Sequence, residues 1–402
     1  MKRPALAILL LVVVGLIAPG ATPSPRSHLY LPLIMKGSLY RYHLPLAAWP
    51  HEEPAAQGGS AVPATTTATP APTATPSRVA PSPDPSRCAN LVYRDGERLM
   101  LNGEPFVFVG INAISLLDPG LPERELPKIM DDIAGWGATM IRIWVRPGND
   151  LDRFERILDL AGPRGLRFVV TLQDYYFYKT SGWFRTHYKT EDLPHIEQVV
   201  TRFRGRPEIA IWEVMNEPWC GAQGEVDDPN CYRILQAWAE DTTALIRRLD
   251  PCRPISLGTT GVRNTDLERQ AFRQLHTIDT VDIVSMHRVP HDWYLDGAEL
   301  KIAHELGKPI FLGEVYELGY NKDGTQISGD VIRKRAQKLD KDMRKALELG
   351  VDGYLLWDYS IGTIIDDKGN RRYFYGVYGY EASDPVGPVI RSLPIPRVPV
   401  IR

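Results

Sequence analysis

Residues Ile209–Glu217 read Ile-Ala-Ile-Trp-Glu-Val-Met-Asn-Glu, a mostly apolar run that ends in two polar residues. Seven further runs of this kind occur along the chain, each bounded by turn residues and followed by an amphipathic stretch, which is the pattern of strand and helix units. Their starts lie about 35 residues apart on average, enough for one strand, one helix and two loops. The eight runs are Phe106–Asn112, Met140–Val145, Arg167–Asp174, Ile209–Glu217, Pro254–Gly261, Ile283–His287, Pro309–Val315 and Gly353–Tyr359.

This alternation predicts an α/β fold with a parallel sheet, because strands that are apolar on both faces need helices to cover them. Two connecting segments, residues 231–249 and 329–349, place apolar side chains at helical spacing; the first ends before Asp250-Pro251 and the second closes at Gly350. Eight strands with right-handed crossovers close most simply into a (β/α)8 TIM barrel. An open doubly wound sheet is the alternative, but its glycine-rich phosphate turn after the first strand is missing.

The two ends of the chain differ in composition from the middle. Of 34 prolines, 15 precede residue 88 and five follow residue 382. The predicted organisation is a signal peptide at 1–21, a short apolar segment of unassigned role at 22–53, a disordered Pro/Ala/Thr-rich linker at 54–87, the barrel at 88–382 and a Pro-rich tail at 383–402.

The first 21 residues predict export. Lys2 and Arg3 precede the apolar run Ala5–Ala18, and small residues with prolines follow, so cleavage is expected near Gly20 or Ala21. The run is short for a bilayer span, and a retained anchor is the alternative. We therefore expect a secreted monomer, with an N-terminal segment that would allow association with the cell surface.

Charge and motifs exclude several classes of function. From residue 88 onward 40 Lys and Arg face 46 Asp and Glu, so the barrel is mildly acidic and a nucleic-acid partner is disfavoured. No phosphate or nicotinamide motif and no G-x-S-x-G elbow is present. Residues 366–370 lack the spacing of a calcium loop and favour a hairpin turn, and Pro290 interrupts the His287 and His291 pair. We expect neither a metal nor another cofactor.

The four cysteines are predicted to form disulfides, because an even number in an exported protein favours them. Three pairings are possible. The short separation of Cys220 and Cys231 favours that bridge together with Cys88–Cys252. Zinc is the rival interpretation, but no C-x-x-C spacing occurs.

Polar and aromatic residues gather where the predicted strands end, which in a TIM barrel is the position of the active site. Glu217 ends the fourth run and Glu314 the seventh, so the barrel brings them to facing positions. A lone glutamate there would more simply form a salt bridge, whereas two facing carboxylates can hydrolyse a glycoside. The other strand-end residues are Asn112, Arg142, Trp144, Asp174, Asn216, His287 and Trp357.

Two motifs carry a resemblance to a known family. Residues 211–218, which contain Asn216-Glu217-Pro218, resemble the Asn-Glu-Pro signature of retaining (β/α)8 glycosidases, and residues 311–314 resemble their seventh-strand nucleophile motif. Over roughly residues 90–380 the chain is most similar to glycoside hydrolase family five, the cellulase and β-mannanase family. The resemblance implies that Glu217 is the general acid/base and Glu314 the nucleophile.

The same resemblance assigns roles around the glutamates. Asn216 would bind the sugar 2-hydroxyl, Arg142 would hold Glu314 ionised, His287 would polarise the pair and Trp357 would stack under the reacting sugar. Glu217 must stay protonated at the working pH, and the negative charge of Glu314 favours that form. The other expected substrate contacts are Asn112, Trp144, Asp174, Tyr316 and Trp293.

Within the family the β-mannanases are the nearest group. Residues 101–106, the Asn216–Cys220 run and the His287-x-x-Pro-x-x-Trp293 pattern resemble theirs. Two departures stand out. Val289 replaces a tyrosine that hydrogen-bonds the nucleophile in the family, with Tyr316 or Tyr176 as possible substitutes, and the third strand ends in Gln173-Asp174 where the family has Asn or His.

The sequence thus favours a retaining, endo-acting hydrolase of a β-1,4-linked polysaccharide, foremost β-mannan. The alternatives are a β-1,4-glucanase, an exo-β-glycosidase of the same family and a catalytically silent barrel that binds carbohydrate. Mannose and glucose differ at the 2-hydroxyl, so the choice depends on which side chains approach that group.

Overall fold

The computed structural model describes residues 88–174, 182–219, 229–262, 266–288, 297–317, 329–374, 380–396 and 399–401. The chain divides into two units, Met1–Pro72 and Thr73–Arg402, and every described residue belongs to the second. The predicted signal peptide, apolar segment and linker all lie outside the described residues.

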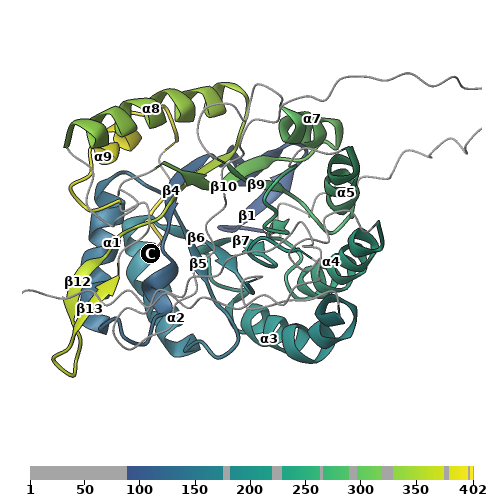
Figure 1. The fold of residues 1–402 in the computed structure, drawn as a ribbon, viewed down its shortest axis with the longest axis horizontal. Coiled ribbons are helices and arrows are strands. Elements are labelled where there is room, and N and C mark those ends of the chain that lie inside the picture. Colours follow the sequence, from purple (N-terminus) through teal and green to yellow (C-terminus); the bar gives the residue numbers. More distant parts are fainter. Residues whose placement is uncertain are drawn as a thin grey trace, which may run out of the picture. The chain divides into compact units, whose positions relative to one another are not determined.

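Eight parallel strands form the centre of the fold and confirm the predicted TIM barrel (Figure 1). They pair in the order β8-β7-β6-β5-β4-β11-β10-β9. A parallel bridge between Ser256 and Ile283 joins the two ends, and the Asp282 amide donates to the Ile255 carbonyl at 2.9 Å. This closure excludes the open sheet. The strands are β4 (Phe108–Asn112), β5 (Met140–Trp144), β6 (Arg167–Thr171), β7 (Ile209–Glu213), β8 (Ile255–Ser256), β9 (Val284–Arg288), β10 (Ile310–Tyr316) and β11 (Gly353–Trp357).

Helices surround the barrel (Figure 1). The two helices expected from spacing, residues 231–249 and 329–349, are confirmed as α4 and α8. The α-helices are α1 (Leu126–Gly135), α2 (Leu151–Ala161), α3 (Tyr188–Phe203), α4 (Pro229–Leu249), α5 (Asp266–His276), α7 (Ala298–Glu305), α8 (Gly329–Glu348) and α9 (Val386–Arg391). Short turns of 3-10 helix cover Ile114–Leu117, Glu123–Glu125 and Gly162–Arg164, and a π-helical turn covers Trp183–His187.

Two apolar layers hold the barrel together. The outer layer lies between strands and helices and includes Ile141 and Val170. The inner layer fills the barrel and includes Met140 and Val169, which alternate with the outer residues along their strands. Because side chains two positions apart share a face, Arg142 follows Met140 on the inner face. The interior therefore changes from apolar to polar toward the strand ends.

A small antiparallel sheet precedes the barrel and was not anticipated from the sequence. It consists of β1 (Val92–Asp95), β2 (Arg98–Leu101) and β3 (Glu104–Pro105). Its Val92, Leu99 and Leu101 belong to the inner apolar cluster, so the sheet covers the end of the barrel where the strands begin. The Leu99 amide donates to Asp352 Oδ1, just before β11, at 3.3 Å.

The C-terminal residues expected to form a Pro-rich tail pack on the barrel. Val386 and Ile390 of α9 are buried, and the Ile401 amide donates to the Gly162 carbonyl at 3.0 Å. The expected hairpin in the loop after the eighth barrel strand is confirmed as β12 (Gly362–Ile365) and β13 (Arg371–Phe374).

The disulfide between Cys88 and Cys252 is present as predicted and ties the first described residue to the start of β8. Cys231 is also disulfide-bonded. Its predicted partner, Cys220, lies outside the described residues.

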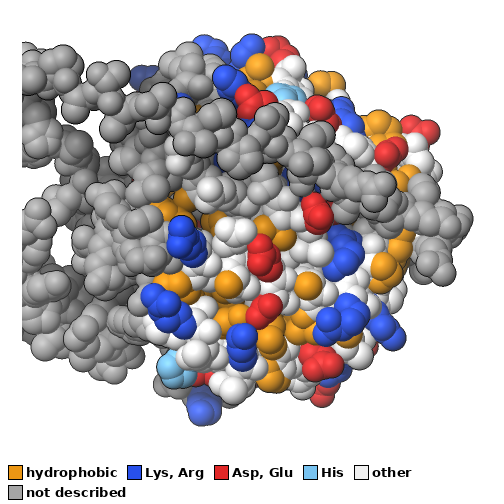
Figure 2. Space-filling model, turned by 90° about the vertical axis from the view of Figure 1, so that its right-hand side faces the viewer, with side chains coloured by type: hydrophobic (Ala, Val, Ile, Leu, Met, Phe, Trp, Pro, Cys, Tyr) orange, Lys and Arg blue, Asp and Glu red, His pale blue; other side chains and the backbone are white. Residues whose placement is uncertain are grey.

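On the surface shown in Figure 2, Lys and Arg side chains are interspersed with Asp and Glu over the described part of that face. This mixture agrees with the small net charge of −2. Among the described residues, no helix combines the length and apolar character needed to cross a membrane.

We predict that Asp352→Asn changes how stability depends on pH. Burial raises the pKa of Asp352 to about 7, and Arg98 and the Leu99 amide only partly oppose it. The folded state therefore binds this proton more tightly than the unfolded chain, and stability falls as pH rises from about 4 to 7. At pH 4 the Asn variant should have the same free energy of unfolding as the native protein. At pH 8 its free energy of unfolding should be about 2–4 kcal/mol higher than that of the native protein. Equal pH slopes in denaturant titrations of the two proteins would contradict this.

Candidate active site

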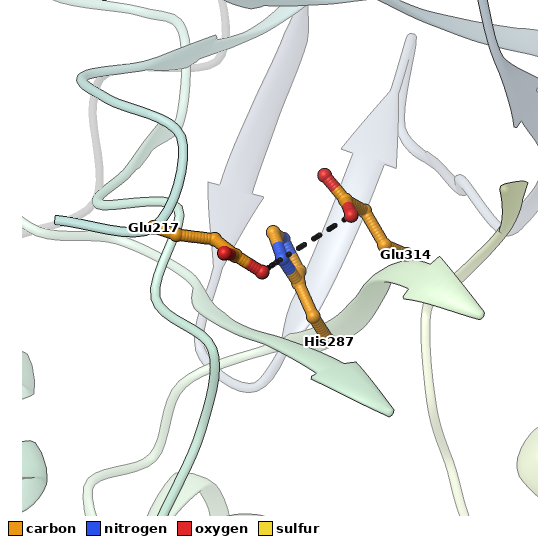
Figure 3. A group of neighbouring side chains, drawn as sticks. All are labelled: Glu217, His287 and Glu314. Atoms are coloured by element: carbon orange, nitrogen blue, oxygen red, sulfur yellow. Dashed lines mark hydrogen bonds and ion pairs between the residues drawn. The ribbon is translucent and has the colours of Figure 1, made fainter. Parts of the chain in front are cut away.

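The polar residues predicted at the strand ends meet at one end of the barrel. Figure 3 shows the Glu217 and Glu314 side chains pointing toward each other, with the His287 ring between them. A carboxyl oxygen of each glutamate and a ring nitrogen of His287 all lie within 4.8 Å of one another. Glu314 is 3% exposed and Glu217 13%, so the pair occupies a nearly enclosed site with access at Glu217.

Arg142 of β5 is the fixed centre of this cluster. Its guanidinium is fully buried and donates from Nη1 to Glu314 Oε1, as predicted, and to Asn112 Oδ1 at 3.0 Å. Nη2 donates to Asn216 Oδ1 at 2.8 Å and forms an ion pair with Glu213 Oε1 at 2.6 Å. Nε donates to the same Glu213 oxygen at 2.7 Å. Each of the three guanidinium nitrogens thus donates to at least one side chain.

Glu217 takes an unusual backbone conformation. Its φ is +49°, in the left-handed region, which costs a residue with a Cβ about 1–2 kcal/mol. Its amide donates to the carbonyl of Gly258 at 2.8 Å. Gly258 itself has φ +77°, and a Cβ there would lie 1.9 Å from the Met215 carbonyl. The close approach of the β8 end thus helps to hold Glu217 facing Glu314.

His287 of β9 links the two carboxylates. Its Nδ1 lies 2.8 Å from Glu217 Oε1 and 3.6 Å from Glu314 Oε2. The other ring nitrogen lies against β10, where a Cβ on Gly313 would approach it to 2.9 Å. Gly313, directly before the expected nucleophile, therefore leaves the space that the imidazole occupies.

Tyr316 supplies a hydroxyl to the expected nucleophile from that residue's own strand. It donates to Glu314 Oε2 and lies 3.4 Å from Glu217 Oε1. Both oxygens of Glu314 therefore accept hydrogen bonds, one from Arg142 and one from Tyr316. Of the two substitutes considered for the missing tyrosine, Tyr316 has the required position, while Tyr176 and Val289 lie outside the described residues.

Opposing effects act on the protonation of Glu314. Burial raises its pKa above the ordinary value, and the charges of His287 and Arg142 lower it. The nearby Glu217 adds to the increase, and the hydrogen bond from Tyr316 opposes it. Arg142 thus favours the ionised form as expected, but it works against burial.

Glu217, His287 and Glu314 offer three ligand atoms at a spacing that could hold a metal ion. The His287–Glu217 hydrogen bond and the His287–Glu314 ion pair account for this spacing. A cation at Glu314 would also be repelled by Arg142, whose guanidinium already binds that carboxylate.

Asn216 is held in one orientation. Its Oδ1 accepts from Arg142, and its Nδ2 donates to Asp174 Oδ1 at 3.3 Å. Arg146 Nη1 lies 3.5 Å from the other Asp174 oxygen. Asp174 therefore orients the amide, and among the described residues one N–H of Asn216 is left for a ligand.

The aromatic residues divide into two groups. Trp144 is 1% exposed, and the Arg142 guanidinium lies over its ring, 4.3 Å from the ring centroid. Asn112, fully buried, donates to the carbonyls of Gly313 and Leu356. Trp144 and Asn112 therefore support Arg142 from beneath, in place of the substrate contacts expected for them.

Trp357 is half-buried and packs against Trp144 with ring centroids 5.5 Å apart. It also lies 6.2 Å from the Tyr316 ring. Its exposed part remains available for stacking. Trp293 lies outside the described residues.

Glu213 is the residue that sequence reasoning missed. It lies on β7, four residues before Glu217, and is fully buried. A carboxylate inside an apolar strand is costly without a partner, so its position in Ile-Trp-Glu-Val was the available signal. The partner is Arg142.

Comparison with known proteins shows what the chain is similar to. A family model described as GH family 5 beta-mannosidase-like matches residues 171–310, which include Asn216, Glu217 and His287. Over this segment the chain is similar to glycoside hydrolase family 5. Glu314 lies four residues beyond the matched segment, in the same barrel.

Curated relatives and a solved structure with the same fold are also similar to the chain. The chain is 24% identical over 345 residues to a protein of Aspergillus flavus named probable mannan endo-1,4-beta-mannosidase F, covering 70% of each chain. It is 25% identical over 202 residues to probable mannan endo-1,4-beta-mannosidase C of Aspergillus terreus, covering 43% of this chain and 50% of the relative. An endo-1,4-beta-mannanase structure from Rhizomucor miehei shares the fold with TM-score 0.60 and 18% identity, covering 75% of this chain and 97% of that one.

We predict that Tyr316→Phe destabilises the ionised form of Glu314 relative to its protonated form. Loss of the hydroxyl should raise the pKa of Glu314, move the acid limb of kcat/KM to higher pH and lower kcat/KM about 10- to 100-fold. Tyr354→Phe is the matched control, because that buried hydroxyl donates to Asp342 at 2.6 Å outside the site. An unmoved acid limb in the Tyr316 variant would refute the assignment.

Proposed function

We propose that this family 5 barrel is a retaining endo-1,4-β-mannanase with Glu314 as nucleophile and Glu217 as general acid/base. The observation that carries the proposal is the approach of the two carboxyl groups, with oxygens within 4.8 Å. Retaining glycosidases separate these groups by about 5–5.5 Å, and inverting ones by about 6.5–9.5 Å to admit a water.

In the first step an oxygen of Glu314 attacks the anomeric carbon while the glycosidic C–O bond breaks. Glu217 gives its proton to the leaving oxygen, and Glu314 becomes a neutral glycosyl ester. Arg142 and Tyr316 prepare this attack, since each binds one oxygen of Glu314 and fixes the carboxylate plane.

In the second step Glu217, now ionised, takes a proton from water, and the water oxygen attacks the same carbon. The ester C–O bond breaks and Glu314 leaves as a carboxylate, which restores the enzyme. His287 Nδ1 contacts Glu217 at 2.8 Å and can stabilise its charge between the two steps. Asn216 offers its remaining N–H to the sugar 2-hydroxyl.

The proposed substrate is a β-1,4-mannan. Support comes from the relatives named mannan endo-1,4-beta-mannosidase and from the family model. Mannose carries its 2-hydroxyl in the axial orientation, so the fixed Asn216 amide is the group expected to distinguish it from glucose. Trp357 would stack on the sugar ring through its exposed face.

A catalytically silent, carbohydrate-binding barrel is disfavoured. Such a protein would not need a nucleophile whose two oxygens are both bound, by Arg142 and by Tyr316. The Tyr316 hydroxyl also answers the main sequence argument for inactivity, the valine at position 289.

We also propose that the enzyme is exported and acts outside the cell. Support comes from the signal-like residues 1–21 and from the Cys88–Cys252 disulfide, since such bonds persist in oxidising compartments. The linker at 54–87 would then separate the barrel from whatever residues 22–53 contact.

Hydrolysis of defined polysaccharides tests the proposed function. The protein should cut linear β-1,4-mannan so that viscosity falls before many reducing ends appear, and should act far more slowly on a soluble cellulose derivative. Glu314→Ala should abolish both activities. Preferential attack on the cellulose derivative, or release of single sugars from chain ends, would refute the proposed substrate or the endo mode.

A further inference from the structure

The guanidinium of Arg142 is shared between two buried carboxylates. Glu213 Oε1 accepts from Nε at 2.7 Å and forms an ion pair with Nη2 at 2.6 Å, and Glu314 accepts from Nη1. Glu213 Oε1 also accepts a hydrogen bond from the Thr171 hydroxyl at 2.8 Å. Glu213 and Arg142 are fully buried, so neither charge is relieved by water.

One positive charge therefore serves two negative ones in the resting enzyme. The charged and titratable groups that face Glu314 are Arg142 from β5, Glu217 after β7, His287 from β9 and Tyr316 from β10. Among the described residues, the Glu213 carboxylate accepts hydrogen bonds only from Arg142 and Thr171. A second carboxylate on Arg142 is not needed to hold the nucleophile in place.

Formation of the glycosyl ester on Glu314 explains why a second carboxylate, Glu213, binds Arg142. When the glycosyl ester forms, Glu314 loses its charge, and Arg142 would be left as a buried cation without a counter-charge. Removing one partner from a buried ion pair is strongly unfavourable. Without Glu213, the uncompensated charge of Arg142 would therefore destabilise the glycosyl-enzyme intermediate.

We propose that Glu213 is a positioning residue that remains the counter-charge of Arg142 while Glu314 is esterified. This inference rests on the proposed double displacement. In the intermediate, Glu213 neutralises the charge of the Arg142 guanidinium. In the free enzyme, the negative charge of Glu213 weakens the attraction between Arg142 and Glu314. The nucleophile can then give up its charge without leaving an unpaired cation.

The surroundings of Glu213 fit this permanent role. A Cβ on Gly258 would approach the carboxyl carbon of Glu213 to 2.9 Å, so the end of β8 packs directly against it. Its second oxygen has no hydrogen-bond partner within the described part of the chain. Glu213 is thus enclosed, with its charge directed to Arg142.

The test is the pH dependence of Glu213→Gln on an aryl β-manno-oligosaccharide. Glutamine keeps the acceptor oxygen for Arg142 and Thr171 but removes the charge, so Arg142 should bind ionised Glu314 more strongly. The acid limb of kcat/KM should move down by about one pH unit, and kcat/KM on its plateau should fall about tenfold or more. An unmoved limb, or one that moves up, would overturn the proposal.

Two controls separate charge from shape. Glu213→Asp keeps the charge, so its acid limb should stay within about 0.3 pH units of the native one even if kcat falls. Asp352→Asn removes a buried carboxylate before β11, at the opposite end of the barrel, and should leave the limb in place.

A second measurement does not require the Gln variant at 213 to fold. Glu314→Gln carries a neutral side chain where the ester would be, and it should melt within about 4 °C of the native protein because Glu213 still balances Arg142. A drop of about 10 °C or more would overturn the proposal. If the native protein cleaves no β-mannoside, the proposed function fails; if it does and these shifts are absent, only the role of Glu213 fails.

Discussion

A single buried guanidinium organises the site. Arg142 donates four hydrogen bonds to side chains on three other barrel strands or just after them (β4, β7 and β10), and Trp144 covers one face. The planar, rigid geometry of arginine makes such a set of contacts specific in direction. The positions of Glu314, Asn216 and Glu213 are therefore not independent, because each is held through the same group.

The barrel places this charged layer directly above an apolar interior. Along β5, Met140 and Arg142 point inward on the same face. Two residues of the strand therefore separate the apolar interior from the charged layer. The apolar layer below excludes water and strengthens every electrostatic contact above it. The β1–β3 sheet covers the other end, where the buried Asp352 has a raised pKa.

The sequence predicted the barrel because eight apolar runs recur at a regular interval, and it predicted Glu217 and Glu314 because both end such runs. It also placed Arg142, Asn216 and His287, since strand ends share one rim. The missed features depend on three-dimensional contact. Trp144 ends a strand like Trp357 but turns beneath the guanidinium, and Glu213 looks like part of an apolar strand until its partner is known. The left-handed backbone at Glu217 arises from the approach of Gly258, which no local pattern reports.

The central claim is that Glu314 forms the covalent intermediate and Glu217 serves as acid/base. The most direct measurement is the configuration of the product that each alanine variant forms from an activated aryl β-mannoside in azide. Glu314→Ala should give the α-mannosyl azide, because azide attacks in place of the missing carboxylate. Glu217→Ala should give the β-mannosyl azide, because azide attacks the ester on Glu314 from the opposite face. The same anomer from both variants, or a β-azide from Glu314→Ala, would contradict the account.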